Sequence, residues 1–245
     1  MYPTSVGCEE CVLYRVREPL YRYRFYWKTP IRVPRRRLAW CSSVLTTDCR
    51  AGTVFPDIFI QTVSIAGFSH THLSGTGAGD LYDISFMPVT LPYKEAEAPL
   101  GIHSLFSHSE ESASAGYYQV RLKDYNINVE LTATERCGIQ RYTFPKADAA
   151  VFLNLRKAMN WDFTNDSHIE VVDSVTVQGY RYSDGWARDQ RLYFRTRFSK
   201  PFAAMQLDTA AIEKEGKRIG TSVIARFDFR LRKENRFLSV LPSPV

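Results

Sequence analysis

Long apolar runs are absent from this sequence. No stretch reaches about 18 consecutive apolar residues, the length that a membrane-spanning helix needs. The first residues, from Met1 to Val16, also lack the apolar core and the small-residue cleavage site of a secretion signal. No segment repeats at a fixed period, which excludes solenoid folds. We therefore expect neither a membrane partner nor a repeat architecture.

Metal-binding cysteine patterns are scarce as well. The chain has 5 cysteines, and Cys8 and Cys11 form a lone C-x-x-C. A zinc site needs a second pair at a suitable spacing. Cys41 and Cys49 do not supply it, because they lie eight positions apart with no histidine near them. A cysteine-based metal site is therefore not expected.

The composition is that of a folded protein with one unusual segment. The chain has 245 residues, of which 44% are hydrophobic and 24% charged, which excludes a chain that is disordered as a whole. The net charge is +6. Residues 1–62 account for +5 of it, and they also hold four of the five cysteines, whereas residues 63–245 carry only +1. Because the basic character belongs to one segment, we do not expect nucleic acid as a partner.

Residues 63–245 show the sequence pattern of a protein rich in strands. Short apolar runs and period-2 alternations are separated by turn-forming clusters such as Ser183-Asp184-Gly185. The only stretch that resembles a helix is short, at residues 209–217. These patterns predict an all-β fold, an antiparallel β-sandwich. The predicted strands lie at residues 117–122, 128–134, 138–144, 149–155, 168–172, 175–181, 191–198 and 222–229.

The first candidate site is the stretch from Gly67 to Asp80, which reads G-F-S-H-T-H-L-S-G-T-G-A-G-D. On a strand, His70 and His72 would point to the same side. A metal pair would need further ligands that the sequence does not show, and a phosphate loop would need a following Lys-Ser/Thr and helix. A polar loop at a sugar site and a purely structural turn remain as alternatives.

The second candidate site is the stretch from Gly179 to Gln190, which reads G-Y-R-Y-S-D-G-W-A-R-D-Q. A tryptophan beside Asp, Arg and Gln is typical of a carbohydrate platform, where the ring stacks on sugar C–H groups. The alternative is that Trp186 is a core residue. No pair of carboxylates for glycoside chemistry can be identified from spacing, and no G-x-S-x-G motif is present.

Several ordered motifs resemble the N-terminal domain of glycoside hydrolase family 92. Besides the two stretches above, they include G-D-L-Y-D-I-S-F-M-P, F-S-H-S-E-E-S-A-S-A-G-Y-Y, E-L-T-A-T-E-R-C-G, R-Y-T-F-P and F-S-K-P-F. The resemblance covers residues 64–229. It implies a calcium-dependent, exo-acting, inverting α-mannosidase that removes terminal mannose from glycans such as N-glycans. Its N-terminal supersandwich-like domain would pack on an (α/α)6 barrel that carries the acid, the base and most of the calcium site.

The resemblance transfers binding roles only to the sandwich. The candidate substrate-binding residues are His70, Thr71, His72 and Ser74, with Trp186 and Asp189 as weaker ones. Because the sequence stops at Val245, we expect the sandwich half of an α-mannosidase without the catalytic barrel. Such a chain should have no catalytic residue or metal ligand of its own, and should be inactive alone. Its partners would be mannose-containing glycans and the barrel domain. The alternative function is a free-standing carbohydrate-binding β-sandwich.

Residues 1–62 depart from the family pattern, and we treat them as a segment separate from the domain at 63–245. Read in a shifted frame with suitable synonymous codons, residues 29–53 give T-Y-P-G-A-S-A-P-F-G-M-V-Q-L-S-P-D-N-R-L-P-G-W-D-G, which matches the family. Residues 55–63 likewise permit P-G-Y-F-H-T-D-S. One hypothesis is a frameshifted translation. The alternatives are a disordered extension and a divergent N-terminus.

The same reading applies to the other end of the chain. A shifted frame turns residues 231–243 into E-G-K-P-V-L-V-R-V-A-I-S, which resembles the next strand of the family. A second shift near Arg230 would lead to an early stop. If these segments supplied strands in an ancestor, the domain should expose sheet edges and be prone to aggregate.

Overall fold

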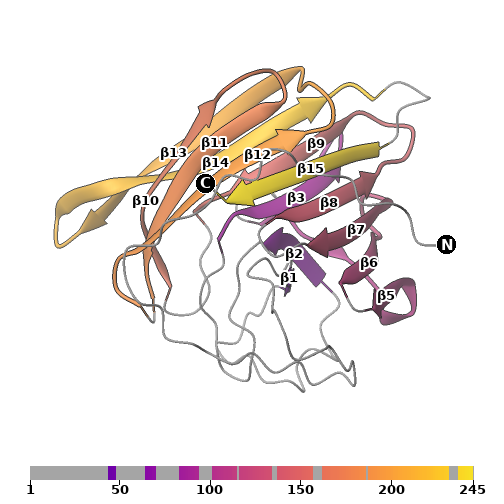
Figure 1. Ribbon diagram of the computed structural model, residues 1–245, viewed down its shortest axis with the longest axis horizontal. Coiled ribbons are helices and arrows are strands. Elements are labelled where there is room, and N and C mark those ends of the chain that lie inside the picture. Colours follow the sequence, from indigo (N-terminus) through magenta and orange to yellow (C-terminus); the bar gives the residue numbers. More distant parts are fainter. Residues whose placement is uncertain are drawn as a thin grey trace.

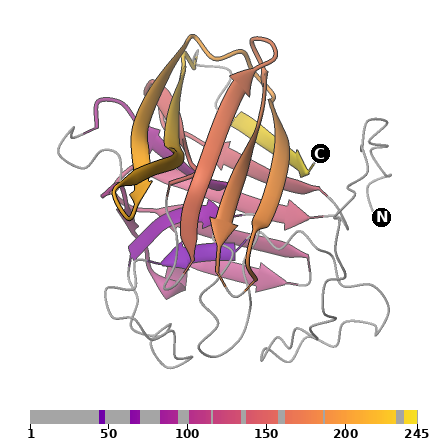
Figure 2. The ribbon, with the colours of Figure 1, turned by 90° about the vertical axis from the view of Figure 1, so that its left-hand side faces the viewer.

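The computed structural model describes residues 44–47, 64–69, 83–93, 101–114, 116–133, 137–156, 162–185, 187–231 and 237–244. Within these ranges the chain forms two antiparallel sheets (Figure 1). In the view of Figure 2 the orange strands of the C-terminal half cross in front of the magenta and pink strands. The described residues contain no α-helix, only a single 3-10 turn at His108–Glu110. The prediction of an all-β sandwich is thereby confirmed.

The first sheet has the strand order β1-β2-β3-β9-β14-β13 among the described residues, and β4 pairs with β2 beside this path. Its central strand β9 is buried from Ala149 to Leu153, because it lies between β3 and β14 and carries only apolar side chains there. The strands are β1 (Val44–Thr47), β2 (Ser64–Ser69), β3 (Ser85–Thr90), β4 (Ser104–Leu105), β9 (Ala149–Asn154), β13 (Ala204–Lys214) and β14 (Lys217–Phe229).

The second sheet has the order β10-β11-β12-β15-β8-β7-β6-β5. β15 lies between β12 and β8, so it joins a three-stranded part to a four-stranded part of the same sheet. Most sequence-adjacent strands here are simple hairpin neighbours. The strands are β5 (Glu111–Ser114), β6 (Tyr117–Leu122), β7 (Ile127–Ala133), β8 (Gly138–Thr143), β10 (Phe163–Val171), β11 (Thr176–Asp184), β12 (Gln190–Phe198) and β15 (Phe237–Pro244).

Aromatic side chains join the two sheets across the core. Phe198 of β12 meets Phe227 and Phe229 of β14, with ring centroids 5.0 and 5.3 Å apart. All three rings are almost completely buried. The alternation expected for residues 128–134 holds at Val129 and Leu131, which face the core from β7. Period-2 burial of this kind is what fixes the register of a half-buried strand.

The expectation of a helix at residues 209–217 is wrong. These residues belong to the β13–β14 hairpin, whose two-residue turn is Glu215-Gly216 with φ of 52° and 75°. Positive φ at both central residues is the geometry of a tight hairpin turn. Ala210, Ala211 and Ile212 are paired with β14 instead of coiling. Ladder pairing along β13 thus overrides a local helix preference.

Of residues 1–62, the structure describes only β1, which pairs with β2. The division at residue 62 and the frameshift hypothesis therefore stay predictions. Among the described residues, no helix combines the length and the apolar character needed to span a bilayer.

Candidate functional site

The first candidate stretch begins in β2 and ends shortly before β3, and the second runs from β11 into β12. β2 ends at Ser69, and Asp83 precedes β3. Both side chains are buried, with 0% and 2% exposure. His70, Thr71, His72 and Ser74 lie between them, outside the described residues. The described part of the site is therefore its base, the residues on either side of this stretch.

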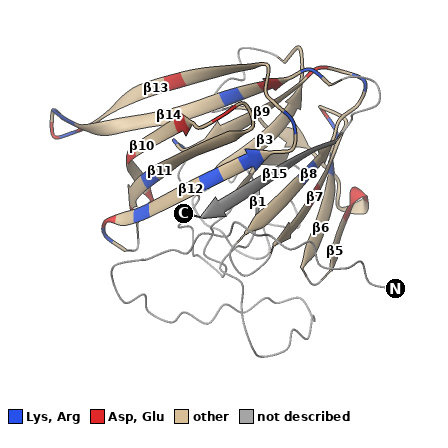
Figure 3. Ribbon diagram, turned by 45° about the horizontal axis from the view of Figure 1, so that its top comes forward, with Lys and Arg blue, Asp and Glu red and all other residues tan. Residues whose placement is uncertain are grey.

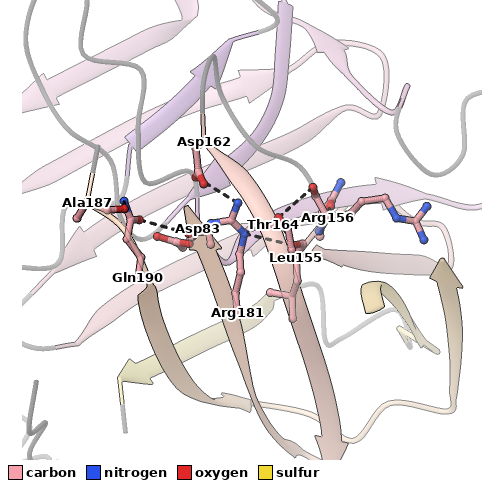
Figure 4. Close-up of polar contacts among 10 residues, drawn as sticks. Asp83, Leu155, Arg156, Asp162, Thr164, Arg181, Ala187 and Gln190 are labelled. Carbon is pink, nitrogen blue, oxygen red and sulfur yellow. Dashed lines mark hydrogen bonds and ion pairs between the residues drawn. The ribbon is translucent and has the colours of Figure 1, made fainter. Parts of the chain in front are cut away.

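Arg181 of β11 forms that base (Figure 4). Its guanidinium is completely buried and donates to the carboxylates of Asp83 and Asp162, the latter at 3.1 Å. Its Nε donates to the hydroxyl of Thr164 at 3.1 Å and to the carbonyl of Leu155 at 3.2 Å. One side chain thereby binds residues next to β3, β9 and β10. We call Arg181, Asp83 and Asp162 the buried ion cluster.

The charges of the buried ion cluster depend on one another. Burial alone would lower the pKa of Arg181, because it penalises the charged guanidinium. The two nearby carboxylates outweigh this and raise its pKa above the ordinary value. A buried charge of this kind is tolerated only when it is paired and hydrogen-bonded. The cluster therefore connects Asp83, which follows residues 70–82, to β11, which leads into the β11–β12 loop.

The β11–β12 loop is held by short polar contacts. The carboxylate of Asp184 accepts from the backbone N–H of Asp189 at 3.0 Å, and this contact is the main cause of its lowered pKa. Gln190 donates to the carbonyl of Ala187 at 3.2 Å and accepts from the Ser183 hydroxyl at 3.3 Å (Figure 4). Asp189 has a φ of 57°, which Asp tolerates better than most residues. These contacts define the shape of the loop.

Of the two candidate residues in the β11–β12 loop, Asp189 is among the described residues. The side chain of Asp189 is 66% exposed and accepts from Nε of Arg191 at 2.8 Å. It therefore lies at the surface of the loop and not in the buried ion cluster. Trp186 lies outside the described residues. The structure thus brings the two loop bases together without testing any of the six predicted sugar contacts.

Sequence reasoning did not single out the buried ion cluster. Arg181 sits in a strand that alternates between outward Tyr180 and Tyr182 and an inward row with Val177 and Ser183. A charged residue on the inward row of a strand was the available signal, because such a residue needs buried partners. Its partners could not be found in the same way, since Asp83 is 98 positions away along the chain.

No metal site is visible in the described part of the chain. Those residues form no group of three or more His, Cys, Asp or Glu side chains able to hold an ion. They therefore do not fit the calcium that the family resemblance implies. The carboxylates of the buried ion cluster are engaged by Arg181, which leaves them no evident role as acid and base.

The sequence of this chain matches the model of a known protein family. The family model for the glycosyl hydrolase family 92 N-terminal domain matches residues 59–240. No curated protein matches the chain. A solved GH92 α-mannosidase, BT3965 from Bacteroides thetaiotaomicron in complex with mannoimidazole, is 27% identical with a TM-score of 0.62. The match covers 74% of this chain and 26% of that one.

Two further structures share the fold at lower identity. The inverting mannosidase BT2199 from the same organism is 22% identical with a TM-score of 0.56, over 74% of this chain and 24% of that one. The GH92 glycosyl hydrolase ccman5 is 19% identical with a TM-score of 0.62, over 84% and 29%. The chain spans about a quarter of the length of these enzymes. Since the family model covers most of the sandwich described above, the chain belongs to glycosyl hydrolase family 92 and carries its N-terminal domain.

Proposed function

We propose that this domain is the sandwich half of an exo-acting α-mannosidase and closes one side of its mannose pocket. The observation that carries the proposal is the buried ion cluster. It ties Asp83, the residue that follows residues 70–82, to β11, the strand that leads into the β11–β12 loop. The relative BT3965 is an α-mannosidase. The proposed substrate is therefore a terminal α-mannoside of a glycan such as an N-glycan.

Within this proposal the two loops supply sugar contacts. His70, Thr71, His72 and Ser74 offer imidazole and hydroxyl groups that can bind sugar hydroxyls. Trp186 would stack on the ring and Asp189 would accept from a hydroxyl. Proton transfer is assigned elsewhere. Inversion needs one carboxylic acid, one carboxylate base and a water between them, and we propose that a barrel domain provides these together with calcium.

The first test uses a gene in which the family reading frame is restored and continues into a barrel. We expect its product to release mannose from α-1,2-mannobiose with inversion, and chelation of calcium to abolish the reaction. The 245-residue chain alone should release none, because in this proposal the acid and the base belong to the barrel domain, and each contributes on the order of 100-fold or more. A folded restored product without α-mannosidase activity would contradict the proposal, as would calcium-dependent activity of the 245-residue chain.

The second test asks whether the loop histidines touch the sugar. In the restored enzyme, His70→Ala and His72→Ala should each lower kcat/KM. The corresponding loss of transition-state stabilisation should be roughly 1–3 kcal/mol where a buried polar partner is left unpaired. The melting temperature should stay unchanged. If the melting temperature falls while the kinetics stay unchanged, the histidines only support the loop. The family assignment would stand in that case, but the site assignment would not.

A further inference from the structure

The outer face of β10, β11 and β12 carries an aromatic cluster that the proposed pocket does not use. We call His168, Tyr180, Tyr182 and Tyr193 the tyrosine face. The register of the three strands places His168, Tyr180 and Tyr193 in one transverse row. Tyr182 follows Tyr180 at the next outward position of β11. The face is thus built on paired strands and not on loops, which is the more precise support for a binding surface.

The rings of the tyrosine face hold one another in fixed positions. Tyr180 and Tyr182 are stacked with centroids 4.3 Å apart, and His168 stacks on Tyr180 at 5.8 Å. The hydroxyls of Tyr182 and Tyr193 are 2.8 Å apart. The hydroxyl of Tyr180 donates to Asp166 at 2.9 Å. Rings ordered in this way lose little further freedom when a ligand binds.

Part of this aromatic surface is open. Tyr193 is 40% exposed, and His168 is exposed at the other end of the row. Tyr180 and Tyr182 are half-buried by their neighbours. An exposed cluster of large aromatic side chains is a mark of a binding surface more than of a solvated one. A tyrosine in this position offers both a ring and a hydroxyl to a ligand.

Charges around the rings balance. Gln178 lies in a transverse row between Glu170 and Arg195, and it donates to Glu170 at 2.9 Å. On the opposite flank, the guanidinium of Arg191 lies 5.4 Å from the Tyr182 ring centroid. Asp166 and Asp189, the ion-pair partner of Arg191, add acidic side chains, and Arg197 adds a basic one further along β12, whose basic residues are blue in Figure 3. Both signs of charge therefore flank the rings. A ligand of either charge would meet side chains of like charge, so the complementary ligand is neutral and rich in hydrogen-bonding groups.

We propose that the tyrosine face binds a neutral oligosaccharide chain. The ring of Tyr193 would stack on a pyranose, and Gln178, Glu170 and Arg195 would bind its hydroxyls. The proposal goes beyond the pocket, which would hold only a terminal mannose at the loops. The tyrosine face would instead hold an internal part of a glycan, or a neighbouring chain, against the flat side of the sandwich.

The test is affinity electrophoresis of the 245-residue chain in native gels that contain phosphate-free α-mannan. We expect retardation that rises with the mannan concentration. Tyr193→Ala should weaken the apparent affinity about twofold to tenfold, since it removes one stacking ring. Tyr193→Phe should retain most of it. The control is Tyr117→Ala, because Tyr117 lies on β6 of the same sheet with a similar exposure of 37%.

Two further measurements separate this surface from the pocket and from other ligands. Saturating free mannose, which would fill a pocket for a terminal sugar, should leave the retardation unchanged. Circular dichroism should show that each variant is folded at the temperature of the gel. Absence of retardation, equal weakening by Tyr193→Ala and Tyr117→Ala, or binding to the polyanion heparin alone would overturn the proposal.

Discussion

Arg181 is a full positive charge without access to water, and this constrains every residue around it. Its guanidinium donates to two carboxylates, one hydroxyl and one backbone carbonyl. A pair of this kind adds little to stability compared with a well-packed apolar alternative, but it is costly to break. Its contribution here is geometric, because the partners come from three separate parts of the chain. Arg181 thereby fixes the position of Asp83 relative to β11.

Replacement of Arg181 should therefore destabilise the domain strongly. Arg181→Met leaves the carboxylates of Asp83 and Asp162 buried without their cation, and we expect a loss of about 3–5 kcal/mol in the free energy of unfolding. The control is Arg191→Met, whose solvent-exposed ion pair with Asp189 should contribute little to stability. Urea denaturation measures both. Equal losses in the two variants would show that the buried ion cluster has no special structural role.

The Tyr182–Tyr193 contact should be visible at high pH. Burial, followed by the hydrogen bond with Tyr193, raises the pKa of Tyr182 to about 12 from its ordinary value of 10.0. The folded chain then keeps a proton that the unfolded chain loses, so this contribution to stability is complete below about pH 10 and disappears as the pH approaches about 12.

NMR of ring-labelled tyrosine can follow this titration. We expect Tyr182 to titrate late and the free energy of unfolding to fall across this pH window. Tyr193→Phe, which removes one hydroxyl, should shift the titration of Tyr182 to lower pH. An unchanged titration in this variant would mean that burial alone causes the raised pKa.

At the scale of strands, the sequence predicts most where alternation is strong or where a short apolar run is bounded by turn residues. The predicted strand at residues 117–122 coincides with β6, and the one at 149–155 with β9. The sequence did not predict β13, because Ala210 and Ala211 favour a helix and only the pairing with β14 makes this segment a strand. The base of the candidate site was not predicted for another reason. Long-range ion pairs leave no local periodicity, so Arg181 could be flagged from sequence but not given partners.

Gly179 of β11 is expected to be irreplaceable. A Cβ at this position would lie 2.0 Å from the carbonyl oxygen of His168 and 3.1 Å from the Phe194 ring. Since backbone cannot yield as a side chain can, Gly179→Ala should separate β10 from β11 and cost at least about 3 kcal/mol. The comparison is Gly216→Ala, where nothing lies within 4 Å and only the φ of 75° is strained.

For Gly216→Ala we expect a loss of about 1–2 kcal/mol. Thermal melting monitored by circular dichroism distinguishes the two glycine variants. If Gly179→Ala melts at the same temperature as Gly216→Ala, the close approach of β10 and β11 at this point is not needed for the fold.

At the scale of the whole molecule, β15 is the strand that makes one sheet out of two parts. It pairs with β12 through Val240–Pro244 and with β8 through residues 237–240. Deletion of residues 237–245 should leave two unpaired strand edges and abolish cooperative unfolding. A synthetic peptide of residues 237–245 should restore it, as an added strand does on an open edge. Cooperative melting of the deleted chain would contradict this role.

The uneven charge of the whole chain leads to a prediction about the gene. If residues 29–62 are a frameshifted translation, the codons from Thr29 to Val63 must permit the family-like reading in the other frame. The single codon of Trp40 ends in the G that the valine of F-G-M-V-Q requires. DNA sequencing checks every position. Codons that forbid the second reading would leave a divergent or disordered N-terminus as the explanation.

The central place of β15 also bears on how the protein is made. A ribosome releases the chain from its N-terminal end, so β8 and β12 emerge well before their common neighbour. The sheet cannot close until residue 244 has cleared the exit tunnel. During that interval two strand edges stand open, and such edges attract other chains. Closure of this sheet therefore waits until β15 has been synthesised, and the yield of folded domain in a cell should depend on chaperones that shield nascent chains.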